Sequence, residues 1–249
     1  MALQTLARPD ARLAGSAPGL GRLVRVELGK SLSTRSGQAV LAATALLAPH
    51  WVPVLVLTGG DVSDPPRLLA ELGALTALLV LSLGVLSSAG ETTHRTALGT
   101  YLAVPRRGRV LAAKTLALAQ LGAYATATGV VTSAAILAVL GVPVPLGPTA
   151  VVAAVATLGG AAFAVTGVGI GAAIAHTPAA LTGSYLVLFL TPPLLHGVWP
   201  AAVEAVDPRQ AVILLATTTP SAGPVVTLLA WVVGPLAVGF LILTRRDIA

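Results

Sequence analysis

The sequence predicts an all-α polytopic membrane protein with six transmembrane helices and with both termini in the cytoplasm. The chain has 249 residues, of which 55% are hydrophobic and only 10% are charged. A soluble domain has about 25% charged residues, so a soluble globular protein is excluded. The apolar residues form runs long enough to cross a bilayer, which takes about 20 residues. Lys and Arg residues gather on one side of these runs, which gives the predicted orientation.

We expect residues 1–19 to form a flexible cytoplasmic tail and residues 20–249 to form a single membrane domain. Residues 20–36 are expected to form an amphipathic elbow helix in the head-group plane, because leucine and valine recur on one stripe while basic residues occupy other faces. Glu27 lies beside the apolar stripe. Its carboxylate is either paired with Lys30 at the surface or in contact with the helix bundle or a partner.

Six apolar runs follow the elbow helix. The predicted spans cover residues of about 38–58, 68–90, 112–140, 149–174, 179–197 and 223–243. The first span is expected to act as an uncleaved signal anchor, because charged residues and a proline interrupt the residues before it. Between the last two spans, the apolar run AVILLA is too short to cross a membrane. Prolines flank this run, so we expect an outer helical hairpin there.

The basic residues orient the chain. Thirteen of the fifteen Lys and Arg residues lie in segments predicted to be inside, and only Arg67 and Arg209 lie outside. Cytoplasmic loops carry such an excess of Lys and Arg. Arg also outnumbers Lys thirteen to two, and Ala is abundant, a bias typical of GC-rich bacterial genomes. We therefore expect a multi-pass protein of the bacterial plasma membrane. Its net charge of +6 is expected to face lipid head groups, not nucleic acid.

The sequence predicts no catalytic, metal-binding or cofactor-binding residue on this chain. There is no cysteine, and the four histidines have no metal-ligand spacing. Gly29-Lys30-Ser31 matches only the end of a nucleotide-binding P-loop, since residue 24 is Val where the motif needs Gly. No charged residue lies near the middle of a span, so we also expect no buried carboxylate. Gly167 and Gly171 are spaced four apart, as on a helix-packing face.

Two other function classes remain open. An intramembrane serine protease also fits six helices, but it needs a serine and a histidine in contact. Ser184 and His196 lie twelve residues apart on one span, a rise of about 18 Å, so only an unseen approach of other segments would supply such a pair. A secondary carrier usually has buried carboxylates within its spans, which are not expected here.

The most cationic internal segment runs from Glu91 to Lys114 and joins the second and third spans. A Glu closes the second span, a Gly-Thr pair follows, and a Pro-Arg-Arg turn leads to a Lys in the third span. These residues are Glu91, Gly99, Thr100, Pro105, Arg106, Arg107 and Lys114. The order resembles the inner loop of ABC-2 type export permeases. The elbow residues Glu27, Lys30 and Arg35 resemble the elbow helix of the same family.

The resemblance implies the membrane subunit of a bacterial ABC exporter. In that family the loop after the second span forms a coupling helix, here around residues 93–104, that docks on a separate ATPase subunit. ATP and Mg would bind that partner, and a second permease copy or a paralogue would complete a dimer. Glu91 and Arg95 are four residues apart in the order that favours an ion pair on a helix. The apolar spans indicate a lipophilic or amphipathic substrate.

Overall fold

The structure is a computed structural model that describes residues 19–94, 96, 106–219 and 221–245, without the side chains of residues 200, 201 and 204. This part of the chain is all-α and contains no strand. Six of its helices are long and apolar enough to cross a membrane. The chain is therefore a multi-pass membrane protein, in agreement with the predicted fold class.

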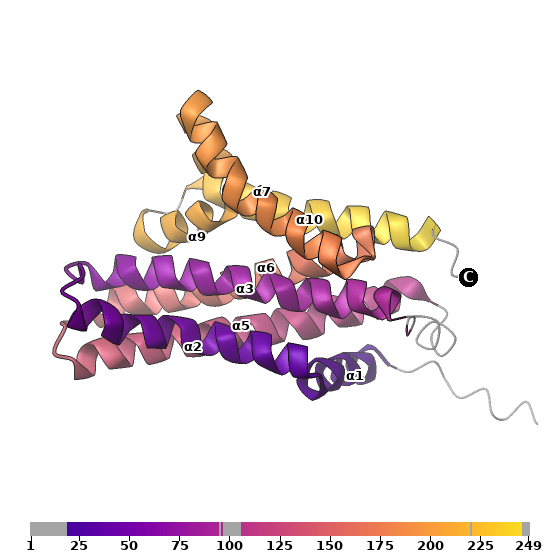
Figure 1. The fold of residues 1–249 in the computed structure, drawn as a ribbon, viewed down its shortest axis with the longest axis horizontal. Helices are drawn as coiled ribbons and strands as arrows, with labels where there is room; N and C mark the ends of the chain where they lie inside the picture. The colour runs from indigo at the N-terminus through magenta and orange to yellow at the C-terminus, as the bar shows by residue number, and fades with distance from the viewer. Residues whose placement is uncertain (1–18, 95, 97–105, 220, 246–249) are drawn as a thin grey trace, which may run out of the picture.

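The helices follow the predicted order (Figure 1). They are α1 (Leu20–Ser33), α2 (Arg35–Leu57), α3 (Pro65–Thr93), α5 (Arg107–Val139), α6 (Leu146–Ile174), α7 (Thr177–Val198), α8 (Pro200–Val206), α9 (Pro208–Thr217) and α10 (Ala222–Arg245). The six candidate spans are α2, α3, α5, α6, α7 and α10. The short helices α8 and α9 occupy the place of the predicted hairpin.

Side chains at the helix starts explain why several spans begin earlier than predicted. Asp64 accepts a hydrogen bond from the Arg67 backbone N–H, so α3 begins at Pro65 and not near residue 68. Thr34 has an extended backbone, and its hydroxyl accepts from the Gly37 N–H. This cap ends the elbow helix at Ser33 and begins α2 at Arg35. Hydropathy cannot locate these starts, because the first turn of a span is often polar.

The bundle is built around α3 and α6, which pack side by side along most of their length. Gly167 and Gly171 of α6 lie against α3. A Cβ atom at Gly167 would overlap the Leu81 carbonyl oxygen, and one at Gly171 would approach the Val85 carbonyl oxygen to 3.0 Å. Gly84 of α3 faces the same crossing. The glycines therefore allow backbone-to-backbone contact between the two central helices.

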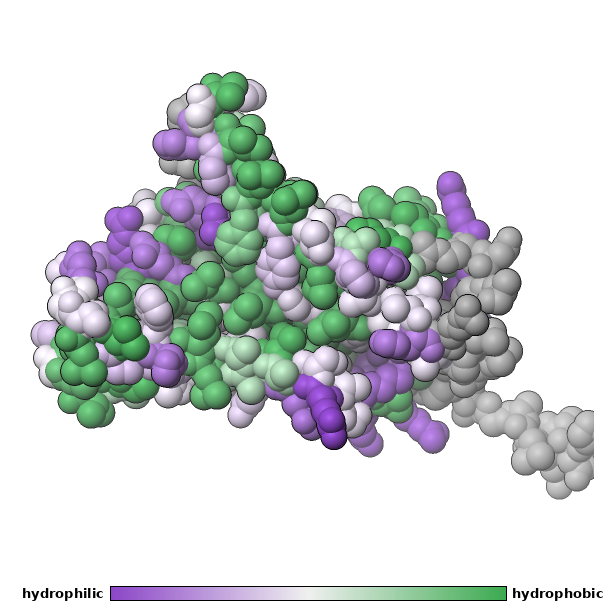
Figure 2. Space-filling view, in the orientation of Figure 1, coloured by the Kyte–Doolittle hydropathy of each residue, from purple (hydrophilic) through white to green (hydrophobic). Residues whose placement is uncertain are grey.

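The remaining helices surround this pair unevenly. Helices α2 and α5 pack on one side of the pair. On the other side, α10 contacts α6, and α9 contacts both α3 and α6. Helix α7 contacts the bundle mainly over its first half and then diverges from it (Figure 1). Figure 2 shows that hydrophilic residues gather mainly toward the two ends of the bundle. Apolar residues dominate the lipid-facing middle, as a membrane domain requires.

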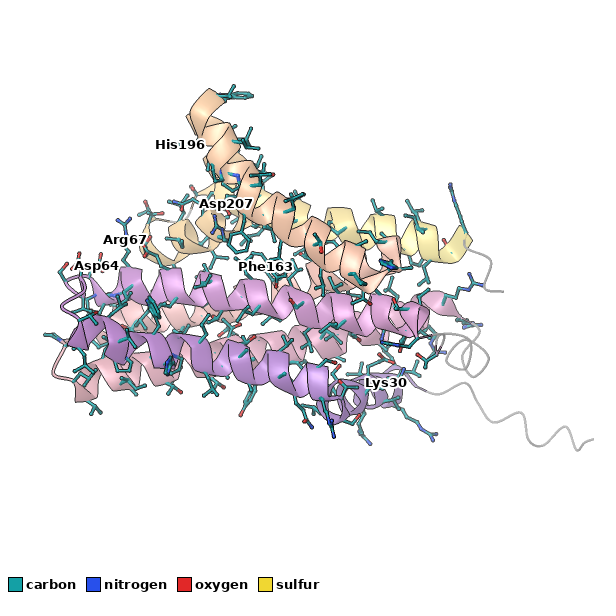
Figure 3. All side chains as sticks on the ribbon, viewed as in Figure 1. Lys30, Asp64, Arg67, Phe163, His196 and Asp207 are labelled. Atoms are coloured by element: carbon teal, nitrogen blue, oxygen red, sulfur yellow. The ribbon has the colours of Figure 1, made fainter. Side chains whose placement is uncertain are left out.

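Helix α1, the end of α3 and the start of α5 lie at one end of the bundle, which we call the α1 end (Figure 1). The end of α10 lies at the same end. Asp64 and Arg67 lie at the opposite end, as Figure 3 shows. The positive-inside rule makes the α1 end the predicted cytoplasmic end.

Candidate functional site

Two glutamates and two lysines meet at the α1 end in a group that we call the charge cluster. Its members are Glu27 and Lys30 of α1, Glu91 of α3 and Lys114 of α5. These residues are far apart in sequence, since Glu27 and Lys114 are separated by 87 positions. The cluster therefore joins the elbow helix to both helices that border the 91–114 loop.

Lys114 is the centre of the charge cluster. Its side chain is 5% exposed, and its Nζ lies 2.5 Å from Glu27 Oε2 and 3.2 Å from Glu91 Oε1. The same ammonium lies 3.1 Å from both the carbonyl oxygen and the hydroxyl oxygen of Ser87. Four acceptors therefore surround a group that has three protons, which fixes the position of α5 relative to α1 and α3.

Lys30 closes the network from the solvent side. Its Nζ donates to Glu27 Oε1 at 2.7 Å and to Glu91 Oε1 at 2.8 Å, and its side chain is 40% exposed. Each glutamate thus contacts both lysines. The two negative and two positive charges balance, which is the condition under which buried charges are tolerated.

The electrostatics of α1 reflect this pairing. Burial by itself would raise the pKa of Glu27, but attraction to Lys114 and hydrogen bonds from Lys114 and Lys30 outweigh it, so its pKa is lowered. For Lys30, burial would lower the pKa, and the hydrogen bonds to Glu27 and Glu91 raise it above its ordinary value. Both groups therefore stay charged at neutral pH.

Glu27 resolves the question that the sequence leaves open. Its carboxylate pairs with Lys30 and also enters the bundle, where the residue is 3% exposed. The expectation of no buried carboxylate is wrong, because Glu27 and also Asp207 (5% exposed) are buried. The pattern of one helix does not reveal what that helix packs against. The signal available in the sequence was the position of Glu27 beside the apolar stripe.

The structure places only some of the expected loop residues. Arg95, Gly99, Thr100 and Pro105 lie outside the described residues, as does nearly all of the expected coupling helix and its Glu91–Arg95 pair. Among the described residues, the Glu91 carboxylate contacts Lys30 and Lys114.

Three expected arginines lie within the described residues. Arg106 is exposed at the cap position of α5, and the Arg107 guanidinium donates to the Leu243 carbonyl oxygen at 2.9 Å. This bond ties the start of α5 to the end of α10. Arg35 is exposed in the first turn of α2.

A cavity of about 650 Å³ adjoins the charge cluster. The end of α1, the first turn of α2, the end of α3 and the start of α7 border it. Lys30 and Glu91 contribute charged groups, while Leu83 and Leu86 contribute apolar surface. The cavity is therefore amphipathic and lies at the predicted cytoplasmic surface of the membrane.

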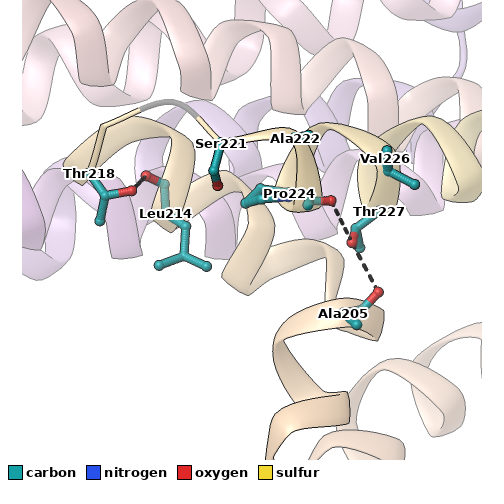
Figure 4. Close-up of a pocket in the computed structure, with 9 residues that line it drawn as sticks. Ala205, Leu214, Thr218, Ser221, Ala222, Pro224, Val226 and Thr227 are labelled. Carbon is teal, nitrogen blue, oxygen red and sulfur yellow. Dashed lines mark hydrogen bonds between the residues drawn. The ribbon is translucent and has the colours of Figure 1, made fainter.

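A second cavity of about 700 Å³ lies near the start of α10 and is lined mainly by apolar and hydroxyl side chains (Figure 4). Thr227 borders it and donates to the carbonyl oxygens of Ala205 and Gly223, at 2.9 and 3.1 Å. Asp207 caps α9 and pairs with Arg209 at 3.0 Å. The Thr227–Ala205 bond holds α8 against α10, whereas the Asp207 contacts are local to the start of α9.

His176, Ser133 and Ser184 have local hydrogen-bond partners. His176 caps α7, accepting from the Ala179 N–H at 3.3 Å. Ser133 and Ser184 donate to carbonyl oxygens one turn back in their own helices. Across residues 19–94, 96, 106–219 and 221–245, no group of three or more His, Asp or Glu residues is arranged to hold a metal ion.

A scan against protein-family models matches no family, and a search of curated proteins finds no significant match. The functional argument therefore depends on the geometry of the α1 end and on the residue pattern of the 91–114 segment.

Proposed function

We propose that this chain is the transmembrane permease subunit of an ATP-driven ABC exporter in a bacterial plasma membrane. A separate ATPase subunit binds ATP and Mg and docks on the 91–114 loop. A second permease copy, or a paralogue, completes the transport path. The substrate is lipophilic or amphipathic, and the chain itself catalyses no reaction.

The charge cluster is the observation that best supports this proposal. A force applied to the loop must reach the spans, and Glu91 and Lys114 lie near the two ends of that loop. Both side chains are bonded to α1, through Lys30 and Glu27 respectively. A displacement of the loop would therefore move α1, the end of α3 and the start of α5 together, because packed and ion-paired elements move as units.

The surface around the loop is suited to an acidic partner. Arg106 is exposed beside the loop, and Arg35 is exposed on the neighbouring helix. Exposed arginines recognise carboxylates with their fork of donors, whereas the four charges of the cluster neutralise one another. The arginines would contribute to docking, and the cluster would transmit the movement.

Co-purification and transport test the proposal. The tagged chain, extracted in mild detergent from its native membrane, should retain a stoichiometric ATPase subunit, and vesicles containing both should transport a lipophilic dye only when ATP is present. Arg106→Glu should reduce the retained ATPase about tenfold, because reversing a charge at an interface places like charges together. Arg67→Glu at the opposite end should retain it.

Three results would contradict the exporter. The first is the absence of any co-purified ATPase. The second is transport that continues without ATP but collapses with an ion gradient, which indicates a secondary carrier. The third is labelling by a serine-directed probe that one Ser→Ala change abolishes, which indicates an intramembrane hydrolase.

A further inference from the structure

The cavity beside the charge cluster is lined by a buried hydroxyl that has no acceptor among the described residues. Ser31 is 5% exposed and lines the cavity, and its hydroxyl has no hydrogen-bond partner among the residues that the structure describes. An unmatched buried hydroxyl is unfavourable, because it has given up its hydrogen bonds to water. A ligand that accepts a hydrogen bond from Ser31 would remove this cost.

Two further donors border the same space. Lys30 has three ammonium protons and two acceptors, Glu27 and Glu91, so one proton remains for a ligand. The first turn of α2 also borders the cavity, through Ser36 and Gly37. The Thr34 hydroxyl accepts from the Gly37 N–H. The backbone N–H groups of Arg35 and Ser36, the first two residues of α2, have no partner within the helix.

The charges around the cavity leave room for an anion. Glu91 is the one carboxylate among the described residues that line the cavity, and Lys30 and Lys114 both contact it. The charge cluster as a whole is neutral. The remaining local field comes from the helix ends that border the cavity: the starts of α2 and α7 attract negative charge, and the ends of α1 and α3 oppose them. A single anionic group can therefore enter without meeting an unpaired carboxylate.

The rest of the cavity wall combines apolar side chains with polar ones, the latter including Thr93, His94, Thr96 and Thr177. Leu86 and Pro178 line it beside the donors. We propose that this cavity binds the phosphate head group of a phospholipid of the inner leaflet, with its acyl chains along Leu86 and Pro178. The phosphate accepts hydrogen bonds from Lys30, Ser31 and the first turn of α2. This inference does not depend on the exporter function.

Two variants should block the site by different means without disturbing the fold. Ser36→Asp adds a negative charge where the phosphate would lie, yet an acidic residue in the first turn favours the helix. Gly90→Leu places a side chain in the cavity, because a Cβ atom at this helical glycine meets nothing within 4 Å. Gly29→Asp and Gly183→Leu are the matched controls, since both glycines lie in helices, have open space around a Cβ atom and do not line the cavity.

Native mass spectrometry of the detergent-solubilised full chain provides the test. Phosphatidylglycerol should bind with a 1:1 component, and diacylglycerol with the same acyl chains should lack it. We expect Ser36→Asp and Gly90→Leu each to weaken that component about tenfold, equivalent to about 1.4 kcal/mol, and the controls to leave it within about twofold. Equal binding of phosphatidylglycerol by all variants would show only annular lipid and overturn the proposal. Displacement of the lipid by millimolar inorganic phosphate would also overturn it, since the occupant would then be free phosphate.

Discussion

Replacing Lys114 by Met removes the ammonium group at the centre of the charge cluster and retains a long flexible side chain. Glu27 would remain buried with Lys30 as its single cation, and the Ser87 carbonyl oxygen would lose its donor from Lys114. Removing one partner of a buried ion pair typically costs about 3–5 kcal/mol. Because Lys30 still neutralises part of the charge, we expect a loss of about 3 kcal/mol in the free energy of unfolding.

The loss in the free energy of unfolding should depend on the buried Glu27 carboxylate that remains in Lys114→Met. The double variant Lys114→Met/Glu27→Gln also lacks the carboxylate that Lys114 neutralises, so its loss in the free energy of unfolding should be smaller than the sum of the two single losses by about 1–2 kcal/mol. The exposed Arg67–Glu71 pair is the control. Its side chains are 68% and 49% exposed, and Arg67→Gln should cost no more than about 0.5 kcal/mol.

Unfolding by sodium dodecyl sulfate in mixed micelles, followed by circular dichroism, measures these differences. The same samples report whether each variant retains its helix content. The cluster would not be a coupled, buried network if Lys114→Met lowered the free energy of unfolding as little as Arg67→Gln does. The same would follow if the losses of Lys114→Met and Glu27→Gln were additive in the double variant.

Three further outcomes follow from the structure. Spin-label distances between α1 and α5 should be constant from about pH 5 to pH 10. The pKa of Glu27 is lowered, so its contribution to stability is lost only as the pH falls through its folded pKa; the pKa of Lys30 is raised, so its contribution is lost only as the pH rises through its folded pKa. Separation of the helices near neutral pH would contradict this. Gly167→Ala should destabilise the α3–α6 crossing by more than about 2 kcal/mol in the same unfolding assay, because its Cβ overlaps a backbone carbonyl, whereas Gly183→Ala should cost nothing. Asp64→Ala should cost about 1 kcal/mol through loss of the cap of α3, and no loss would show that water replaces the cap.

Some parts of the site were predictable from local sequence because they depend on one helix or one loop. The basic residues near Glu91 and Lys114 mark the α1 end, and the amphipathic pattern of residues 20–36 predicts an elbow helix that the structure contains as α1. Other parts were not predictable. The contacts of Glu91 with Lys30 and of Glu27 with Lys114 span 61 and 87 residues, and no local pattern specifies which distant side chains meet.

The sequence by itself determined the class of protein, the six spans and their predicted orientation, because the cost of placing polar backbone and charge in lipid acts on each segment separately. Only the tertiary structure decided that Glu27 is buried, that Lys114 joins three helices and that an amphipathic cavity adjoins them. The physical reason is that a buried charge is stable only beside its partners. Those partners are brought together by the packing of α1, α3 and α5, and not by their positions along the chain.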